Sequence, residues 1–517
     1  MFPAQTSLIP VTVAITKYVA AHGFGGNYPY WYLGTTPVKY LTGPVVPAVL
    51  IGLQSLFGTT NYFTWAILLV LVSQFIWAAG WFVFVKFLSG SLRLGILVAG
   101  LVLLSPLDLV LSLGLGETSA ILAVSFTPWV LFLFAKYKSF IPASLSFAFL
   151  LLTNTVSAIP AILGLIILVF VTEKKWEAGL KRLFLVFAIG WLLTLWWYSP
   201  GYWFTLLGAP SIGGRSVIGS LNAIFGFIKG LAPIFLAVAV VSFGFAKRTK
   251  LEKFAAIWLF TFGIFTLFRM FSDIDFWMDW TAWMGEAEVG LVLLISGVLS
   301  QFLVSKKRST NLNSGFELQN PSRSSLRQQP ILSENSKVTR GWLRHVFGYF
   351  KTAPQVKVLI LIFIVYFVAG WGLAWQKRDF WLPRREIGQT VEFKIAKWLE
   401  KETVNCEPST VNCQLIFLSG STAFWLNSLV DVKQVRGGVD QASVDKIWRE
   451  AAWEVREGGI TEDTEKALKA LNINYIVVHN DQSAEFYHDF KNVEKFENTT
   501  NLVKFFEELG DLIYKVQ

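Results

Sequence analysis

The sequence predicts an all-α polytopic membrane domain with about ten transmembrane helices, followed by a C-terminal soluble α/β domain. Of the 517 residues, 54% are hydrophobic and only 15% are charged, and the mean hydropathy is positive. Ten apolar stretches are separated by short polar or basic loops, the pattern of a chain that crosses a membrane repeatedly. After Gln376 the apolar stretches end, and strand-like segments alternate with helix-like segments.

The ten predicted spans cover residues 62–86, 91–107, 118–135, 140–153, 155–172, 183–199, 231–246, 254–271, 289–305 and 356–376. The apolar run from 140 to 171 would be about 50 Å long as one helix at ~1.5 Å per residue, which is too long for one crossing. We therefore predict two short crossings, with Asn154 in the polar tip between them. Nine spans fall in residues 61–305 and the tenth is 356–376.

The other predicted regions are defined by length and composition. The apolar pieces 7–21 and 45–57 are shorter than the roughly 20 residues that a crossing needs, so residues 1–60 are expected to form interfacial helices and a loop. Residues 306–355 are basic and rich in Ser, Asn and Gln, which predicts a flexible cytoplasmic linker. Residues 377–517 form the predicted α/β domain.

The charge distribution predicts the orientation. The net charge is +10, but the Lys and Arg residues gather in the loops 86–93, 136–138, 173–182 and 247–253 and in the linker. Such loops face the cytoplasm, and their position explains the positive charge without a nucleic-acid partner. The alternate loops then face outward, together with residues 1–60 and the C-terminal domain. This pattern predicts a multi-pass plasma-membrane protein with an extracytoplasmic C-terminal domain.

Candidate functional residues lie in three outward loops. The segment Ser272–Gly290 combines three tryptophans with five acids, which are Asp273, Asp275, Asp279, Glu286 and Glu288. Asp108 and Glu117 occupy the loop 105–117, and Arg215 follows two glycines in PSIGGRS. Carboxylates can bind hydroxyl groups or a divalent cation, and the forked guanidinium suits phosphate. A lipid phosphate that carries a polar headgroup would match this combination.

A structural interpretation of the same residues stays open. The tryptophans Trp277, Trp280 and Trp283 fit the aromatic belt of any membrane surface, with the acids as solvated loop residues. Glu117 stands just ahead of a helix start that Thr118 or Ser119 would cap, where the helix dipole favours a carboxylate.

Other kinds of site receive no support from the sequence. It contains no Walker loop, dinucleotide-binding fingerprint, zinc-ligand pair or Gly-x-Ser-x-Gly nucleophile motif. Its two cysteines, Cys406 and Cys413, permit one small disulfide in an oxidising compartment or two free thiols. No residue set specifies a cofactor, although the carboxylates are compatible with a divalent cation.

Several segments resemble the large prokaryotic membrane proteins related to GT-C glycosyltransferases, some of which are labelled 6-pyruvoyl-tetrahydropterin synthase-related membrane proteins. The likeness rests on WYLGTTPVKYLTGPVVP, WYSPGYWFTLLGAPSIGGRS, DIDFWMDW and FLSGSTAFWLNSLVDVKQVRGGVDQAS, and it extends over nearly the whole chain. The resemblance implies a membrane enzyme that transfers a sugar from a polyprenyl-phosphate donor to a glycan, lipid or protein acceptor at the outer face. A carboxylate would serve as the base.

The resemblance also implies roles for individual residues. Glu117 and Asp108 would be catalytic acids or metal contacts, and Arg215 would hold the phosphate. The remaining expected substrate contacts are Asp273, Asp275, Asp279, Glu286 and Glu288, with Trp31, Tyr32 and Lys39 from the first outer stretch. In the C-terminal domain, Trp425, Arg436 and Asp440 are either acceptor contacts or fold determinants.

The chain departs from the GT-C pattern in its first loop. GT-C proteins place a membrane helix before this loop and the principal acid within it, whereas here that helix is missing and no Asp or Glu precedes Asp108. Two explanations are open: the chain begins inside a longer protein, or it is a member without the usual acid. The alternative function is therefore a non-catalytic membrane scaffold or polysaccharide-assembly subunit with GT-C architecture.

Overall fold

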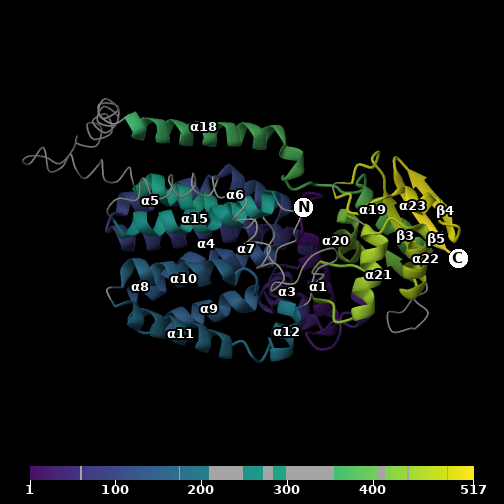
Figure 1. Ribbon diagram of the computed structural model, residues 1–517, viewed down its shortest axis with the longest axis horizontal. Coiled ribbons are helices and arrows are strands. Elements are labelled where there is room, and N and C mark those ends of the chain that lie inside the picture. Colours follow the sequence, from purple (N-terminus) through teal and green to yellow (C-terminus); the bar gives the residue numbers. More distant parts are fainter. Residues whose placement is uncertain are drawn as a thin grey trace, which may run out of the picture.

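The protein consists of a helix bundle beside a C-terminal α/β domain, with the N-terminal helices between them (Figure 1). The structure is a computed structural model. It describes residues 1–58, 61–173, 175–208, 249–271, 283–297, 354–403, 414–418, 420–438, 442–485 and 487–517. The mostly helical architecture, with several candidate membrane helices and a small sheet, agrees with the coarse fold class expected from the sequence.

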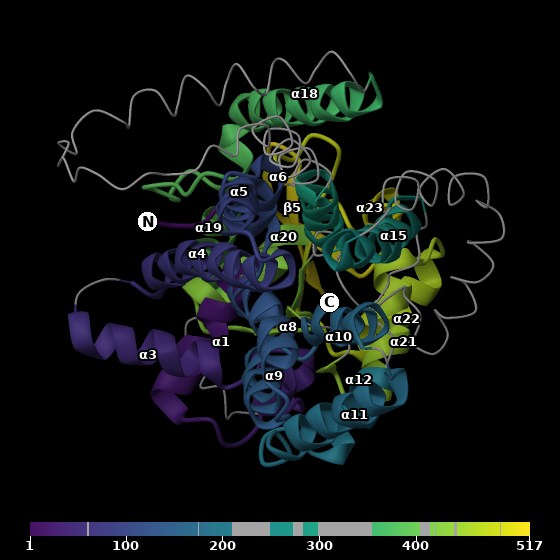
Figure 2. The same cartoon turned by 90° about the vertical axis from the view of Figure 1, so that its left-hand side faces the viewer.

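The bundle is made of helices that run back and forth along its long axis. Its described helices are α4 (Tyr62–Ser89), α5 (Leu92–Leu103), α6 (Pro106–Val110), η2 (Leu111–Leu115), α7 (Thr118–Ser125), α8 (Thr127–Lys136), α9 (Ile141–Thr153), α10 (Ala158–Thr172), α11 (Trp176–Leu192), α12 (Pro200–Gly208), α15 (Lys250–Phe271), residues 283–297 and α18 (Pro354–Gln376). In Figures 1 and 2, α18 lies along one edge of the bundle and α11 along the opposite edge.

Several of these helices are suited to a membrane. Among the described residues, Tyr62–Ser89, Thr118–Lys136 and Lys250–Phe268 are long and apolar enough to cross one. A fourth span results if Leu92–Leu103 and Pro106–Leu115, which are bent by 41°, count as one. The predicted break near Asn154 is present, because α9 ends at Thr153 and α10 begins at Ala158. The total of ten spans stays a prediction.

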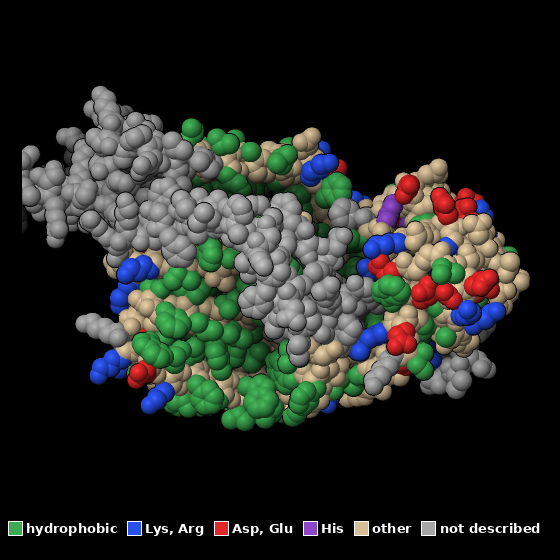
Figure 3. All heavy atoms as spheres, in the orientation of Figure 1, with side chains coloured by type: hydrophobic (Ala, Val, Ile, Leu, Met, Phe, Trp, Pro, Cys, Tyr) green, Lys and Arg blue, Asp and Glu red, His purple; other side chains and the backbone are tan. Residues whose placement is uncertain are grey.

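The two ends of the bundle differ in charge. Lys and Arg side chains gather at the end far from the C-terminal domain, at the left of Figure 3. The exposed residues there include Lys86, Arg93, Lys138, Lys175 and Lys181, all from the loops predicted to be cytoplasmic. The turns at the other end face the C-terminal domain.

The bundle core is aromatic, and glycines allow its helices to approach closely. Trp81 on α4 packs edge-on against Trp258 on α15, with ring centroids 5.7 Å apart. A Cβ at Gly80 would meet Pro128 of α8 at 2.6 Å, and one at Gly164 would meet Trp258 at 2.5 Å. Small residues at such crossings bring membrane helices into van der Waals contact.

The C-terminal domain is a five-stranded mixed sheet covered by helices. Its elements are η3 (Arg378–Phe380), α19 (Val391–Glu402), β1 (Leu415–Phe417), α20 (Gly420–Leu429), β2 (Lys433–Gln434), α21 (Lys446–Glu457), α22 (Thr461–Ala470), β3 (Tyr475–His479), α23 (Glu494–Glu497), β4 (Leu502–Glu508) and β5 (Asp511–Val516). The strand order is β2-β1-β3-β5-β4; β1 is parallel to β2 and β3, and β5 is antiparallel to β3 and β4.

Alternate side chains of β3 face opposite layers of this domain. Tyr475 and Val477 pack with α19 and α20, whereas Ile476 and Val478 pack with α21 and α22. This alternation is the two-residue period of a strand that is buried on both faces.

The N-terminal elements join the two parts. They are α1 (Ile9–His22), η1 (Tyr32–Gly34), α2 (Val38–Leu41) and α3 (Val45–Phe57). The sequence predicts interfacial helices here, but α1 is largely buried because it packs against α3, α4 and α20. Two glycines of the C-terminal domain allow it to approach the N-terminal elements closely. A Cβ at Gly437 would meet Trp31 at 2.5 Å, and one at Gly438 would meet Val11 at 2.3 Å.

Candidate functional site

The candidate site lies at the end of the bundle that faces the C-terminal domain, where the short helix α6 carries Asp108 (Figure 1). Ser105 begins this helix as its N-cap, and its hydroxyl accepts a hydrogen bond from the Asp108 amide at 3.0 Å. An N-cap serine and a proline at the next position are standard helix-start signals. The aspartate is therefore fixed on a helical turn rather than in a loop.

Asp108 belongs to a group of carboxylates that includes Glu286 and Glu288, which we call the three-carboxylate cluster. The Ser105 hydroxyl donates to Glu288, and the Tyr366 hydroxyl of α18 donates to Glu288 Oε1 at 2.7 Å. With neighbouring valines, Ser105, Asp108 and Glu288 surround a gap that is too small to hold a water molecule. A Cβ at Gly285 would lie 3.4 Å from Asp108 Oδ1, so the aspartate contacts the backbone of the facing helix.

Glu286 is buried without a hydrogen bond to its carboxyl group. The side chain is 1% exposed, and among the described residues neither carboxyl oxygen has a partner. Its backbone carbonyl instead accepts a hydrogen bond from Trp258 at 2.9 Å. The sequence places Glu286 and Glu288 in a loop before a span at 289–305, and this boundary is wrong because both lie on the helix of residues 283–297. Donors from Ser105 and Tyr366 allow Glu288 to be buried there.

Glu117 has different neighbours. It is the N-cap residue of α7, and the Ser119 hydroxyl donates to its carboxylate. Asn154, at the end of α9, donates to Ser119 at 3.2 Å, and Thr12 of α1 is a further neighbour. The sequence predicts Thr118 or Ser119 as the cap; the structure instead has Glu117 at this position. In the described structure no hydrogen bond joins Glu117 to Asp108.

The two acids are connected along the chain by residues 109–116, which include the π-helix η2. Single π-helical turns occur frequently at functional sites. Asp108 and Glu117 are each partly exposed, whereas Glu286 and Glu288 are buried. The candidate site thus combines two partly exposed acids with two buried ones.

Of the three substrate contacts expected within residues 1–60, two are buried in the protein and one is partly exposed. Trp31 and Tyr32 are fully buried in the interior of the protein. Trp31 donates to Asn427 at 2.8 Å, and the Tyr32 ring lies 5.1 Å from that of Trp448. Lys39 is partly exposed, with its ammonium group 5.9 Å from the centre of the Tyr40 ring.

Four of the predicted site residues, Arg215, Asp273, Asp275 and Asp279, lie outside the described residues. Asp440 of the C-terminal domain also lies outside them. Trp425 and Arg436 have structural partners: Trp425 stacks on Phe63 with ring centroids 5.6 Å apart, and Arg436 forms an ion pair with Asp489. Within the described ranges, no three His, Cys, Asp or Glu residues are placed to hold a metal ion.

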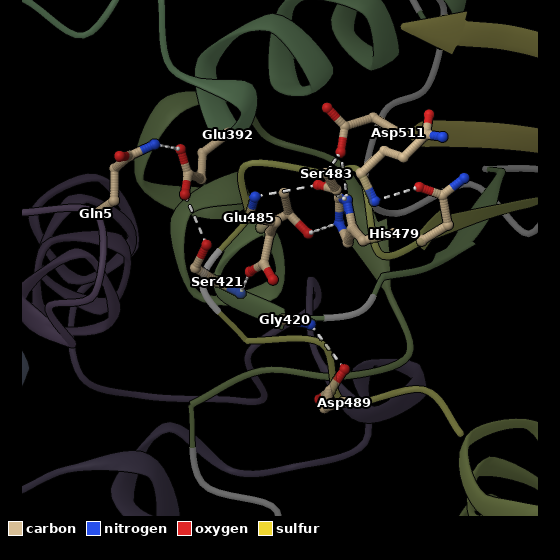
Figure 4. A network of polar contacts seen from close by, with 12 residues as sticks. Gln5, Glu392, Gly420, Ser421, His479, Ser483, Glu485, Asp489 and Asp511 are labelled. Carbon is tan, nitrogen blue, oxygen red and sulfur yellow. Dashed lines mark hydrogen bonds and ion pairs between the residues drawn. The ribbon is translucent and has the colours of Figure 1, made fainter. Parts of the chain in front are cut away.

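A polar network in the C-terminal domain was not foreseen from the sequence (Figure 4). It lies at the carboxyl ends of β1 and β3, the edge of a parallel sheet where ligands commonly bind. His479 Nδ1 lies 2.7 Å from Asp511, and His479 Nε2 lies 3.3 Å from the Thr422 hydroxyl. The sequence offers one indication of this network, because His479 stands near the end of the strand-like segment NYIVVHN.

The same network contains two carboxylates that hold the start of α20, of which Glu485 is buried and Asp489 is partly buried. The Gly420 amide donates to Asp489 at 2.8 Å, and the Ser421 amide donates to Glu485. Burial raises the pKa of Glu485 to about 8, although its hydrogen bonds with Ser421 act in the opposite direction. Gly420 has a φ of +63°, and a Cβ there would overlap Glu485 at 2.1 Å. Glycine is therefore required for this approach.

The comparisons with known proteins concern the fold. No family model matches the sequence, and no curated protein matches it. Among solved structures, the oligosaccharyltransferase AglB from Archaeoglobus fulgidus, in complex with an inhibitory peptide and a dolichol-phosphate, aligns with 98% of this chain and 70% of its own, at 12% identity and a TM-score of 0.52.

Two further structures are similar at lower scores. The arabinofuranosyltransferase AftD from Mycobacteria aligns with 99% of this chain, at 16% identity and a TM-score of 0.48, and this chain spans 40% of its length. ArnT from Cupriavidus metallidurans, bound to undecaprenyl phosphate, aligns with 98% of this chain and 92% of its own, at 12% identity and a TM-score of 0.44. The structural neighbours are GT-C glycosyltransferases, and the chain has the GT-C fold.

Proposed function

We propose that this protein is a membrane glycosyltransferase that transfers a sugar from a polyprenyl-phosphate donor to a glycan, lipid or protein acceptor at the outer face of the membrane. The observation that carries the proposal is the gathering of carboxylates, within a GT-C fold, at the bundle end that faces the C-terminal domain. AglB, which shares the fold, was solved with a dolichol-phosphate. This supports a lipid phosphate of the same class as the donor carrier here.

The chemistry requires a base and a leaving group. The acceptor hydroxyl attacks the anomeric carbon, a new carbon–oxygen bond forms, and the bond from that carbon to the phosphate oxygen breaks. A carboxylate takes the hydroxyl proton, and the lipid phosphate leaves with the bonding electrons. We assign the base to Glu117 or Asp108 because both are partly exposed, whereas Glu286 and Glu288 are buried.

The remaining assignments are proposed from the sequence. Arg215 would hold the donor phosphate, and Asp273, Asp275 and Asp279 would shape the acceptor site, with Lys39 as a further polar contact. A divalent cation stays an expectation from the sequence alone, because the described residues place no three ligands to hold one. The kinship with the 6-pyruvoyl-tetrahydropterin synthase-related membrane proteins is part of the same proposal.

Sidedness is the first test, because the proposal requires the C-terminal domain to be extracytoplasmic. In a variant with Cys406 and Cys413 replaced by serine, single cysteines are introduced at the exposed positions Asp481 and Lys138. A membrane-impermeant maleimide added to intact cells should label Asp481→Cys and leave Lys138→Cys unlabelled until the cells are opened. The reverse pattern would contradict the proposed site of transfer.

The second test is catalysis by the full-length protein in lipid nanodiscs, with radiolabelled polyprenyl-phosphate sugars as donors. Glu117→Gln should lower transfer by about 10²-fold or more, as expected when a general base loses its charge. The matched control is Glu462→Gln, on an exposed face of α22, which should transfer like the wild type. Unchanged transfer by Glu117→Gln would remove Glu117 from the mechanism, and absence of transfer from every donor by the wild type would favour the scaffold alternative.

A further inference from the structure

Residues 5–7, which we call the strap, lie between the loop that carries Glu117 and the C-terminal domain. On the loop side, the Thr6 hydroxyl donates to the carbonyl of Gly114. The Ser7 hydroxyl donates to the carbonyl of Gly116 at 3.3 Å. The strap therefore binds the backbone of Gly114 and Gly116, which stand three residues and one residue before Glu117.

On its other side the strap is bound by the C-terminal domain. Gln5 donates to Glu392 of α19 at 2.9 Å, and Glu392 also accepts a hydrogen bond from the Ser421 hydroxyl at 2.6 Å (Figure 4). The Gln5 carbonyl accepts from the Trp425 indole at 3.0 Å, and the Tyr487 hydroxyl donates to the Thr6 carbonyl at 3.4 Å. Three hydrogen bonds thus connect the strap to this domain, and the Thr6 hydroxyl also lies 3.1 Å from the carbonyl of Phe380 in η3.

The loop that the strap holds has little freedom of its own. Leu111, Leu113 and Gly114 are buried, and a Cβ at Gly114 would meet the Trp381 side chain at 2.9 Å. Gly116 separates η2 from α7 in an extended conformation, with φ −75° and ψ 155°. Since the backbone here leaves one helix and enters another, hydrogen bonds to its carbonyls set the direction in which the next side chain projects. That side chain is Glu117.

We propose that Thr6 and Ser7 are positioning residues for Glu117, and that the C-terminal domain sets the orientation of this carboxylate through Gln5 and Glu392. This inference rests on the proposed function, because it assigns a role to the domain in the same reaction. Neither hydroxyl touches the reacting atoms. Their effect is on the geometry of the base, and a misplacement of about 1 Å can cost on the order of 10²-fold in rate.

The kinetic test uses Thr6→Val, which keeps the shape of the side chain and removes its hydroxyl. We expect kcat to fall by about 10²-fold while KM for the polyprenyl-phosphate sugar changes by less than about twofold. Thr6→Ser, which restores the hydroxyl, should recover most of the activity. The matched control is Thr499→Val, because the buried Thr499 hydroxyl donates to the Lys495 carbonyl at 2.7 Å within the C-terminal domain. This control should retain wild-type kcat.

A second readout separates positioning from loss of stability. The acidic limb of the kcat–pH profile reports protonation of the carboxylate base. Its midpoint should shift along the pH axis in Thr6→Val and stay unchanged in Thr499→Val. Equal activity losses in the two variants, in proportion to their unfolded fractions, would overturn the inference. So would wild-type kcat in Thr6→Val. If Glu117→Gln is inactive while Thr6→Val is unaffected, the proposed function stands and the positioning role fails.

The inference can also be tested without turnover. Hydrogen exchange of the amides from residue 115 to residue 119 should be faster in Thr6→Val than in the wild type, and unchanged in Thr499→Val. If these amides exchange at the wild-type rate in Thr6→Val, the strap does not hold the loop, whatever reaction the protein catalyses.

Discussion

Glu392 and Asp511 of the C-terminal domain and Glu286 of the helix bundle are all buried carboxylates, but they differ in their hydrogen-bond donors. In the domain, Glu392 is 2% exposed and accepts hydrogen bonds from Gln5 and Ser421, and Asp511 is 6% exposed and contacts His479 and Ser483. In the bundle, Glu286 is as deeply buried as Glu392, yet no described group donates to its carboxyl oxygens.

Under the proposed function, the difference separates carboxylates that stabilise the fold from carboxylates that take part in the reaction. A buried carboxyl group without donors costs free energy, and in a membrane bundle such groups mark sites of function. Asp108 also has one oxygen without a partner. Under the proposed function, the partner-free oxygen of Asp108 would receive a hydroxyl proton from the acceptor, whereas both carboxyl oxygens of Glu392 are already occupied.

The largest expected effect is on catalysis. Asp108→Asn should reduce sugar transfer by about 10²- to 10⁴-fold, because an amide cannot accept a proton, while the thermal unfolding midpoint stays the same or rises. The matched change in the other region, Asp511→Asn, should reduce transfer only in proportion to any loss of folded protein. If Asp108→Asn transfers sugar at the wild-type rate and unfolds at a lower temperature, Asp108 stabilises the fold and does not act in catalysis.

The second prediction concerns stability. Glu392→Ala leaves the Gln5 amide and the Ser421 hydroxyl without their acceptor, and should lower the free energy of unfolding by about 2 kcal/mol. Glu286→Ala removes a carboxylate that no described donor needs, and should cost less than about 1 kcal/mol or be stabilising. Unfolding in mixed micelles, followed by tryptophan fluorescence, measures both. Equal costs would show that the two acids are equivalent.

The third prediction is a pH dependence within the C-terminal domain. Burial raises the pKa of Glu485 to about 8, above its unfolded value of about 4.5, so the folded protein holds this proton over a range in which the unfolded chain releases it. The associated stability is fully present below about pH 4.5 and is lost as the pH rises through about 8. Unfolding midpoints measured from pH 5 to 9 should fall less steeply in Glu485→Gln than in the wild type. Identical slopes would contradict the assignment.

The smallest expected effect concerns the acid of the three-carboxylate cluster that does have donors. Tyr366→Phe removes the hydroxyl that donates to Glu288 at 2.7 Å and leaves the hydrogen bond from Ser105 in place. The free energy of unfolding should fall by about 1 kcal/mol. Tyr62→Phe, whose position lies at the start of α4 and outside this cluster, is the control. If Tyr366→Phe lost more free energy of unfolding than Glu392→Ala, the bundle carboxylate would contribute more to stability than the carboxylate of the C-terminal domain, contrary to expectation.

Much of the fold could be predicted because hydrophobic runs and helix breaks are local properties of the sequence. The break at Asn154, the long helix α4 and strand β3 all follow from such patterns. The span predicted at 183–199 differs from helix α11, which begins at Trp176 and ends at Leu192. Residues 193–199 are as apolar as a helix but form turns. Strand β4 was missed, since its exposed sequence LVKFFEE lacks the burial pattern of the other strands.

The site was predictable only as a set of acids on one side of the membrane. That Asp108 meets Glu288 depends on how α6 packs against the helix of residues 283–297, which no local pattern specifies. Ser105 was available as an N-cap three residues before Asp108, but Tyr366 gave no signal. The burial of Trp31 and Tyr32 also depends on the docking of a domain four hundred residues away in the chain.

The glycine pair at 437 and 438 limits how the two halves of the molecule can move. Because Trp31 and Val11 occupy the space where side chains would stand, the joint has no clearance for a sliding motion of the C-terminal domain along the helix ends. Any large rearrangement of the domain must separate Gly437 and Gly438 from Trp31 and Val11 and expose these side chains to water. The domain is therefore expected to move with α1 as a single body.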